Sequence, residues 1–466
     1  MAKKITTAWF CSSCGNESPK WMGRCPACGE WNTMVEEPKA ARSGSGAATG
    51  SVSRDRGLLG VAQAEPIQLR NIDLSNEERL KLGNAEVERI LGGGLVAGSM
   101  VLIGGEPGIG KSTLALQIPL HCKELKTLYV SGEESPRQIK LRSNRLCEGG
   151  EDRSNCMILC ETLLENIIKQ AQQQKPELLV VDSIQTIYSD AMDSSAASVS
   201  QVRECATALL RFAKESGTPV ILIGHITKDG SIAGPKVLEH IVDVVLQFEG
   251  DTRHSYRMLR SIKNRFGSTA ELAIFEMTDR GLREITNPSQ ILTPMHGEHL
   301  SGVAVGSMID GTRPFMIEIQ ALVSTAAYGM PQRSATGFDS RRLNMLLAVL
   351  EKRAGFKLSA KDVFLNVAGG MKVNDPSCDL AVVAAILSST FDSEVSQKCC
   401  FAGEIGLSGE IRPVGNLERR TAEAARLGYE AIYVSKYSSP EALATKASIS
   451  VIPIGTIGDL LRSLFK

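Results

Sequence analysis

A glycine-rich segment with the spacing G-x-x-x-x-G-K-S runs from Gly105 to Ser112. Glycines let the backbone turn tightly, so that several N–H groups point at one anion. In such a loop the lysine contacts the β- and γ-phosphates of a nucleotide and the hydroxyl holds Mg²⁺. We therefore predict a site for ATP and Mg²⁺, with Lys111 on the phosphates and Ser112 on the metal. The residues expected to bind the nucleotide are Gly105, Glu106, Pro107, Gly108, Ile109, Gly110, Lys111, Ser112 and Thr113.

Acidic side chains follow two later apolar runs. Glu133 and Glu134 come just after the run 127–130, and Asp182 ends the run 178–181. A carboxylate just past a strand, beside a phosphate-binding loop, is well placed to polarise the attacking water. Asp182 fits a second role, in which the carboxylate supports Mg²⁺ through its coordinated water. His225, at the end of a further apolar run, either senses the γ-phosphate or is structural.

Four cysteines form two C-x-x-C pairs separated by ten residues, Cys11 with Cys14 and Cys25 with Cys28. Two such pairs can place four thiolates around one Zn²⁺. A redox dithiol would need only one pair, and a module of about thirty residues needs a metal to fold. We therefore predict a zinc site.

The three tryptophans of the chain, Trp9, Trp21 and Trp31, lie in the same short module. They either pack against the zinc site as a small core or offer a stacking surface to single-stranded nucleic acid. Packing of at least some of them is favoured, because the module has few other large apolar residues. The neighbouring Lys20 and Arg24 keep the second interpretation open.

The elements that must position these residues are alternating strands and helices. A strand at 100–103 precedes the glycine loop, and a helix begins after it at Leu114. This alternation predicts a largely parallel sheet covered by helices, an α/β fold. We expect a zinc module at 1–35, a Gly- and Ser-rich linker at 36–60, an ATPase domain at 61–287 and a further domain at 288–466.

The composition limits the function classes. The chain has 466 residues, of which 43% are hydrophobic and 22% charged, and its formal net charge is zero. Any nucleic-acid binding must therefore come from a local surface. The start of the chain does not read as a signal peptide, and no apolar run approaches the ~20 residues of a membrane helix. We expect a cytoplasmic protein with no membrane association.

Several motifs together resemble the bacterial RadA (Sms) family of RecA-like repair ATPases. They are the four cysteines, the glycine loop, the segment 131–135, the segment 224–228 and Lys-Asn-Arg-Phe-Gly at 263–267. The resemblance implies single-stranded and branched DNA as substrates, RecA recombinase as a partner, branch migration as the activity and a hexameric ring. It also implies that Lys263 and Arg265 reach a neighbouring subunit's ATP or couple hydrolysis to DNA. By themselves these two residues read equally well as an exposed basic turn.

The C-terminal half resembles the proteolytic domain of Lon proteases. Ser377 falls where that family carries its nucleophile, and Glu418 falls where it carries its lysine. A serine–lysine dyad needs a neutral amine to take the serine proton, and a carboxylate has the wrong charge and reach. We therefore expect a Lon-like α+β domain that is inactive as a protease. Basic residues along 341–361 would be either a DNA-binding surface or a solvated helix face.

The sequence thus predicts a DNA-dependent ATPase of recombinational repair. One alternative is an ATP-dependent Lon-like protease, which Ser377 favours and Glu418 opposes. Another is a regulator whose assembly is switched by nucleotide. A small-molecule kinase is disfavoured, because it would leave the zinc module and the Lon-like half without a use.

Overall fold

The computed structural model describes residues 7–11, 16–38, 68, 79–147, 155–192, 194–225, 238–250, 256–293, 300–326, 331–444 and 448–465. The chain forms two compact units. The first comprises Met1–Phe248, Ser261–Ser268 and Asp279–Gly281, and the second comprises Glu249–Arg260, Thr269–Thr278 and Leu282–Lys466. The second unit therefore includes residues that precede the predicted boundary at residue 288, namely Glu249–Arg260, Thr269–Thr278 and the chain from Leu282 onward.

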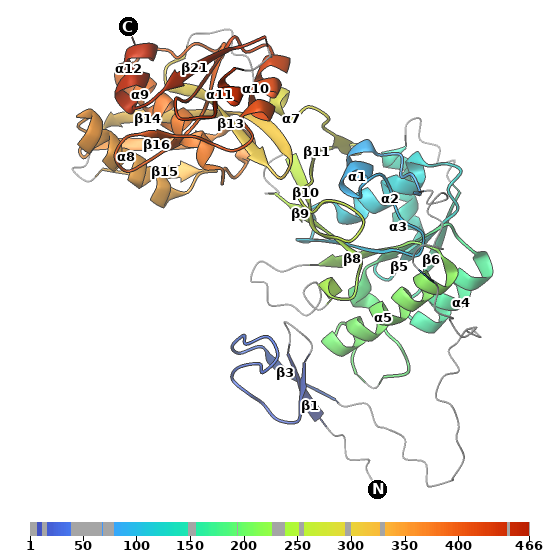
Figure 1. Ribbon diagram of the computed structural model, residues 1–466. Coiled ribbons are helices and arrows are strands. Elements are labelled where there is room, and N and C mark those ends of the chain that lie inside the picture. The colour runs from blue at the N-terminus through green and yellow to red at the C-terminus, as the bar shows by residue number, and fades with distance from the viewer. Residues whose placement is uncertain are drawn as a thin grey trace, which may run out of the picture. The chain divides into compact units, whose positions relative to one another are not determined.

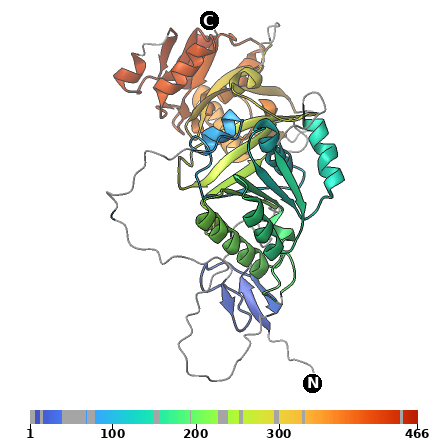
Figure 2. The ribbon, with the colours of Figure 1, turned by 90° about the vertical axis from the view of Figure 1, so that its right-hand side faces the viewer.

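A three-stranded sheet forms the N-terminal module, coloured blue in Figure 2. Its strands are β1 (Thr7–Cys11), β2 (Glu17–Ser18) and β3 (Met34–Pro38), in the order β2-β1-β3. Strand β3 pairs with β1 as far as Thr7 opposite Pro38. The prediction that the linker starts at residue 36 is thus wrong for 36–38, because pairing with the first strand extends β3. The predicted linker residues 39–60 lie outside the described residues.

A nine-stranded sheet follows, with the strand order β12-β11-β10-β9-β4-β8-β7-β5-β6. The strands from β9 to β6 in this order pair in parallel. Parallel strands end at the same edge of a sheet, which is where ligands bind in α/β folds. The strands are β4 (Met100–Gly105), β5 (Thr127–Ser131), β6 (Cys156–Cys160), β7 (Leu178–Asp182), β8 (Val220–His225), β9 (Val244–Glu249), β10 (Tyr256–Asn264), β11 (Leu272–Thr278) and β12 (Gly281–Glu284).

Helices cover both faces of the parallel part of this sheet (Figure 1). Helices α4 (Leu164–Gln174) and α5 (Val199–Ser216) lie on one face, where their apolar side chains share a core with β4, β5, β7 and β8. Helices α2 (Lys111–His121) and α3 (Pro136–Leu146) lie on the other face, and α1 (Ala85–Ile90) precedes β4. This arrangement confirms the predicted RecA-like α/β core.

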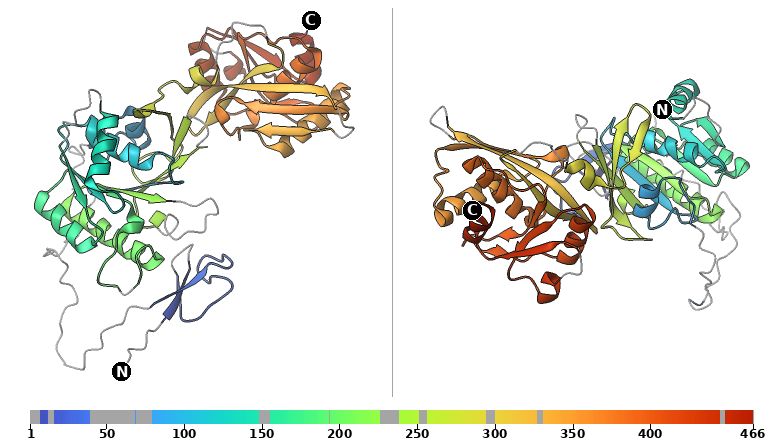
Figure 3. Two further views of the ribbon diagram at one scale, coloured as in Figure 1. Left: turned by 180° about the vertical axis from the view of Figure 1, so that it is seen from behind. Right: turned by 90° about the horizontal axis from the view of Figure 1, so that it is seen from above.

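The second unit contains a seven-stranded sheet with the order β15-β16-β14-β13-β17-β20-β21, whose yellow to red strands appear in Figure 3. Helix α9 (Asp379–Phe391) is buried along ten consecutive residues from Asp379 to Ser388 and forms the centre of this unit's core.

The remaining strands of this unit are β13 (Val303–Asp310), β14 (Arg313–Thr325), β15 (Arg333–Thr336), β16 (Lys361–Val367), β17 (Cys399–Ala402), β18 (Glu404–Ile405), β19 (Ile411–Arg412), β20 (Ala431–Ser435) and β21 (Ser450–Ile454). Its other helices are α7 (Pro288–Leu292), α8 (Ser340–Ala354), α10 (Leu417–Arg426), α11 (Pro440–Leu443) and α12 (Ile457–Leu464). Within the described parts of the chain, no helix combines the length and apolar character needed to cross a membrane.

Candidate nucleotide and metal sites

The glycine loop joins the end of β4 to the first residue of α2. Gly105, Gly108 and Gly110 have φ angles of 155°, 75° and 117°. A Cβ at Gly105 would also lie 2.9 Å from the Cβ of Phe248, so any larger residue would displace the loop. Gly110 caps α2 without a side-chain hydrogen bond, which leaves the first N–H groups of this helix to be satisfied by a bound anion. The loop therefore has the backbone form that a phosphate site needs.

Lys111 is buried and its ammonium group is held by the loop itself. Its Nζ donates to the carbonyl oxygens of Gly105 and Glu106, each at 2.9 Å. Burial lowers the pKa of Lys111 from 10.5 to about 8, against the opposing effect of the nearby carboxylates Asp182 and Glu133. A bound phosphate would add negative charge next to Lys111 and would therefore favour the charged form of its amine.

Three strand ends bring the predicted acidic residues and His225 together. Asp182 ends β7, and its Oδ2 accepts a hydrogen bond of 2.6 Å from the hydroxyl of Tyr129 on the adjacent strand β5. Glu133 follows β5, and its Oε1 accepts a hydrogen bond of 2.8 Å from Ser183. The same Oε1 lies 3.6 Å from Nε2 of His225 at the end of β8. His225 lies opposite Gly105 in the pairing of β8 with β4, so these side chains lie at the end of the sheet where the glycine loop begins.

Glu134 has a different environment from Glu133. Its carboxylate is paired with the guanidinium of Arg142 on α3. The next residue, Ser135, forms a capping box with Gln138 that fixes the start of that helix. Glu134 is thus tied to the helix that follows, whereas Glu133 faces the ends of β7 and β8.

Sequence reasoning did not identify Tyr129, Ser183 or Arg142 as parts of this site. Tyr129 is 1% exposed, and both burial and the neighbouring Asp182 raise its pKa well above the usual value, so its hydroxyl remains a hydrogen-bond donor. Its position two residues before Ser131, which lies opposite Asp182, puts both side chains on one face of the sheet. Tyr129 could therefore have been identified only from the pairing of β5 with β7, which the sequence alone does not reveal.

Lys263 and Arg265 lie at the end of β10 and just beyond it. The Nζ of Lys263 donates to the carbonyl oxygens of Glu239 and Val242, at 2.6 and 2.8 Å. Arg265 forms an ion pair of 3.2 Å with Asp243, a buried carboxylate that also pairs with Lys214 at 3.0 Å. In the part of the chain that the structure describes, these contacts hold both side chains on the segment 239–243 and not on the glycine loop.

Three of the four predicted zinc ligands come together in the N-terminal module. The sulfur atoms of Cys11, Cys25 and Cys28 all lie within 4.8 Å of one another, and those of Cys11 and Cys28 are 3.7 Å apart. Sulfur atoms bound to one tetrahedral Zn²⁺ at 2.3 Å lie about 3.8 Å apart, so the sulfur cluster fits this metal. Cys14 lies outside the described residues.

The serine in the Lon-like half is held by an arginine. Ser377 is buried in a short 3-10 turn, Pro376–Cys378, just before α9, and its Oγ donates to the carbonyl oxygen of Ser307 at 2.8 Å. Arg420 is 3% exposed, and one of its nitrogens donates to Oγ of Ser377 at 2.9 Å. Glu418 is exposed in the first turn of α10. The prediction that Glu418 takes the place of the lysine is therefore wrong, because the helix turns Arg420 towards the serine.

Arg420 also neutralises a carboxylate beside the serine. It forms an ion pair of 2.7 Å with Asp375, which itself accepts hydrogen bonds from the backbone N–H groups of Ile309 and Ser377. Burial would raise the pKa of Asp375, but Arg420 and these N–H groups hold it below its usual value. A permanently charged guanidinium cannot accept the serine proton, so this arrangement provides no base for Ser377.

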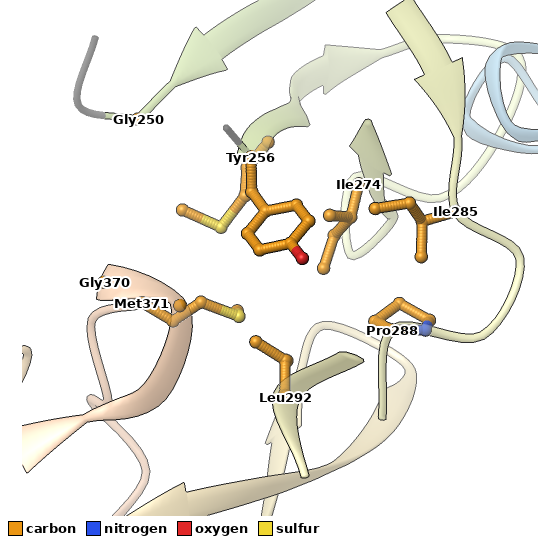
Figure 4. A pocket seen from close by; sticks show the side chains of 10 residues that line it. Gly250, Tyr256, Ile274, Ile285, Pro288, Leu292, Gly370 and Met371 are labelled. Atoms are coloured by element: carbon orange, nitrogen blue, oxygen red, sulfur yellow. The ribbon is translucent and has the colours of Figure 1, made fainter. Parts of the chain in front are cut away.

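Two of the cavities among the described residues lie in the second unit. One, of about 30 Å³, is apolar and is lined by Tyr256, Ile274, Leu292 and Met371 among others (Figure 4). It is far too small for a nucleotide. The other, of about 460 Å³, is lined by Arg260, Asp310, Asp375 and Arg420 among others. Arg260 and Asp310 pair through two hydrogen bonds of 2.7 and 2.8 Å, and Arg420 pairs with Asp375, so these charges are already matched.

Comparisons with known proteins agree with this division. Family models match for an AAA domain at residues 63–231, a rubredoxin metal binding domain at 9–36 and subunit ChlI of Mg-chelatase at 319–438. The chain is 46% identical to DNA repair protein RadA of Bacillus subtilis, over 99% of both chains. It is also 46% identical to DNA repair protein RadA of Listeria monocytogenes, over 99% of both, and 42% identical to that of Streptococcus pyogenes, over the full length of both.

Proposed function

Because the chain belongs to the RadA family of DNA repair proteins, we propose that it is a DNA-dependent ATPase that acts on recombination intermediates. The phosphate loop within an AAA domain already identifies a nucleotide-binding ATPase, and the family identifies a protein of DNA repair. The proposal adds that ATP hydrolysis responds to single-stranded DNA and drives branch migration.

One observation carries the hydrolytic part of the proposal. The carboxylates of Asp182 and Glu133 lie at the edge where the parallel strands end, which is the edge at which β4 leads into the glycine loop. In the proposed mechanism Lys111 and the backbone of the loop bind the phosphates, while Ser112 and Asp182 hold Mg²⁺, which neutralises phosphate charge. Glu133 orients and polarises the attacking water, and His225 responds to whether the γ-phosphate is present.

We further propose that the site is completed by a second copy of the chain. Lys263 and Arg265 are held away from their own loop by contacts with 239–243. In a ring, the same residues would face the nucleotide of the next subunit, where a guanidinium stabilises charge that develops on the phosphoryl group. A hexamer, RecA recombinase and branched DNA are the assembly, partner and substrate that this proposal implies.

The zinc module and the Lon-like half have supporting roles in this proposal. Cys11, Cys14, Cys25 and Cys28 would bind one Zn²⁺, which supplies the folding energy that so small a module lacks. The Lon-like half is proposed to be a scaffold without peptidase activity, since Arg420 donates to Ser377 where a base would be needed. Basic side chains of its helix α8 are not all available for DNA, because Arg342 forms an ion pair with the buried Asp379.

The deciding experiment measures ATP hydrolysis by the full-length protein with and without single-stranded DNA. Hydrolysis should rise with DNA, and Lys111→Ala should abolish it in both conditions because the phosphates lose their cation. Lys123→Ala, which changes an exposed lysine, is the matched control and should behave as the unaltered protein. If DNA left the rate unchanged, the nucleotide-switched regulator would be the better account, and normal turnover in Lys111→Ala would rule out the proposed site.

A further inference from the structure

Two of the three tryptophans do not belong to the core of the zinc module. That core consists of Cys11, Cys25 and Met34, with Trp9 packed against it. Trp21 and Trp31 are 54% and 70% exposed. Large aromatic side chains are rarely left in water on so small a domain unless they bind something. The two exposed indoles therefore need a function other than folding the module.

A hairpin around the second cysteine pair holds these indoles next to each other. Arg24 and Trp31 form an antiparallel bridge, and the N–H of Asn32 donates to the carbonyl oxygen of Gly23 at 2.8 Å. A Cβ placed on Gly23 would lie 3.5 Å from the ring of Trp21 and 3.8 Å from that of Trp31. Both indole rings thus lie next to Gly23, which has no side chain that could cover them.

Cations flank this aromatic surface. The guanidinium of Arg24 lies 5.9 Å from the centre of the Trp31 ring, and its Nε donates to the carbonyl oxygen of Gly29 at 2.8 Å. Lys20, next to Trp21 in the chain, is exposed. Aromatic faces that stack with bases, next to cations that meet the phosphates, are the features by which proteins bind single strands without reading sequence.

We infer that Trp21, Arg24 and Trp31 form a platform on which unpaired bases of single-stranded DNA stack. The inference rests on the proposed function, in which single-stranded DNA stimulates the ATPase, and it names the module that contacts that DNA. The faces of bases in a duplex are covered by their neighbours, so the platform selects single strands. Among the described residues of the module, the cations beside the rings are Lys20 and Arg24, so we expect stacking to supply more of the binding than phosphate contacts do.

The tryptophan content makes this inference directly measurable. The chain has three tryptophans, all in this module, so the tryptophan fluorescence of the full-length protein reports on the module alone. We expect an oligonucleotide of about twenty thymidines to quench this emission as its bases stack on the indoles. An abasic oligonucleotide of the same length carries the same phosphates and should not quench it. Equal quenching by the abasic strand would overturn the inference.

Paired substitutions separate stacking from folding. Trp21→Ala with Trp31→Ala should remove the quenching and weaken binding of the thymidine strand roughly thirtyfold or more, because two stacking contacts, each worth about fivefold or more, are lost. The remaining Trp9 should keep its emission, and zinc content should be unchanged, which shows that the module is folded. Trp21→Phe with Trp31→Phe keeps the aromatic faces and should bind as the unaltered protein. Unchanged affinity in a folded double-alanine protein would contradict the platform.

The same samples distinguish this inference from the proposed function. If thymidine strands stimulate the ATPase of the unaltered protein but quench no tryptophan, the platform is wrong and the DNA-dependent ATPase stands. If they quench tryptophan without stimulating hydrolysis, the platform stands and the DNA-dependent ATPase is wrong.

Discussion

Glu133 and Glu134 are neighbours in the chain, yet their side chains have different partners. Glu133 accepts from Ser183 and faces His225, whereas Glu134 is paired with Arg142 on the following helix. An acid that activates water must have a carboxylate oxygen available on the side of the phosphates. At the scale of single residues, we propose on this ground that Glu133 has the catalytic role and Glu134 a structural role.

We therefore predict unequal effects of two matching substitutions. Glu133→Gln should lower kcat for ATP hydrolysis at least a hundredfold, which is the usual contribution of a general base. Glu134→Gln should lower it less than tenfold, because the amide still accepts a hydrogen bond from Arg142. The measurement is steady-state ATPase together with nucleotide affinity, which should change little in either variant. Equal losses of kcat would show that the assignment is wrong.

The buried Lys111 predicts uptake of a proton on nucleotide binding. Its pKa is about 8 in the free protein, and bound phosphates raise it by favouring the ammonium form. Near pH 7 the Lys111 amine is already charged in the free protein, so ATP binding should be accompanied by little proton uptake. Above pH 8 the free amine is mostly neutral, so uptake should approach one proton per ATP and affinity should fall as pH rises.

Calorimetry of ATP binding in two buffers of different ionisation enthalpy measures this uptake. Asp182→Asn provides a comparison, because removing a carboxylate that favours the charged lysine should lower its pKa and move the onset of uptake to lower pH. The folded pKa lies below the ordinary 10.5, so this group also makes the free protein more stable as pH rises from about 8 towards 10.5. An uptake that did not depend on pH would exclude Lys111 as its source.

At the scale of elements, the buried side chain of Arg420 links α10 both to the sheet of the Lon-like half and to the segment just before α9. Arg420 contacts Ser307 on β13, and Ser377 and Asp375 in that segment. Its removal would leave a carboxylate buried without its cation, which typically costs about 3–5 kcal/mol. The guanidinium of Arg420 therefore stabilises this part of the fold, at the position where a protease of this kind would have its catalytic amine.

Arg420→Ala should consequently loosen the start of α9 more than any change on the exposed side of α10. Hydrogen exchange of the backbone amides in α9 should become faster, by a factor that corresponds to a loss of about 3–5 kcal/mol in local stability. Arg419→Ala, one position earlier and exposed, is the control and should leave exchange in α9 unaffected. The effect should shrink at acid pH, because Asp375 needs no cation once it is protonated.

At the scale of the whole molecule, the ATPase is proposed to work only as an assembly. Asp243 keeps Lys214 as a partner when Arg265 is changed, so Arg265→Ala should fold. The Arg265→Ala protein should lose most ATPase activity if the guanidinium of Arg265 acts on the nucleotide of a neighbouring subunit.

Mixing variants tests this directly. In an equal mixture of Lys111→Ala and Arg265→Ala subunits, about a quarter of the interfaces of a ring would combine an intact loop with an intact arginine. The mixture should therefore recover roughly that share of activity, although each variant alone is inactive. A mixture as inactive as its components would place Arg265 outside the neighbour's site.

Local spacing in the sequence was enough to predict the chemistry of the two candidate sites. The glycine loop, the strand that ends in Asp182 and the paired cysteines act through residues close in the chain, so their patterns are readable without a fold. The α/β core and its strands β4, β5, β7 and β8 were predicted for the same reason, since hydrophobic periodicity is a local property.

Only the tertiary structure decided which distant residues meet. Pairing of β5 with β7 brings Tyr129 to Asp182, and one turn of α10 places Arg420, not Glu418, against Ser377. The hairpin at the second cysteine pair leaves Trp21 and Trp31 in solvent while Trp9 packs inside. These outcomes depend on the order of the strands and on the rotation of the helices about their axes. Both are set by the packing of the whole chain and cannot be read from local sequence patterns.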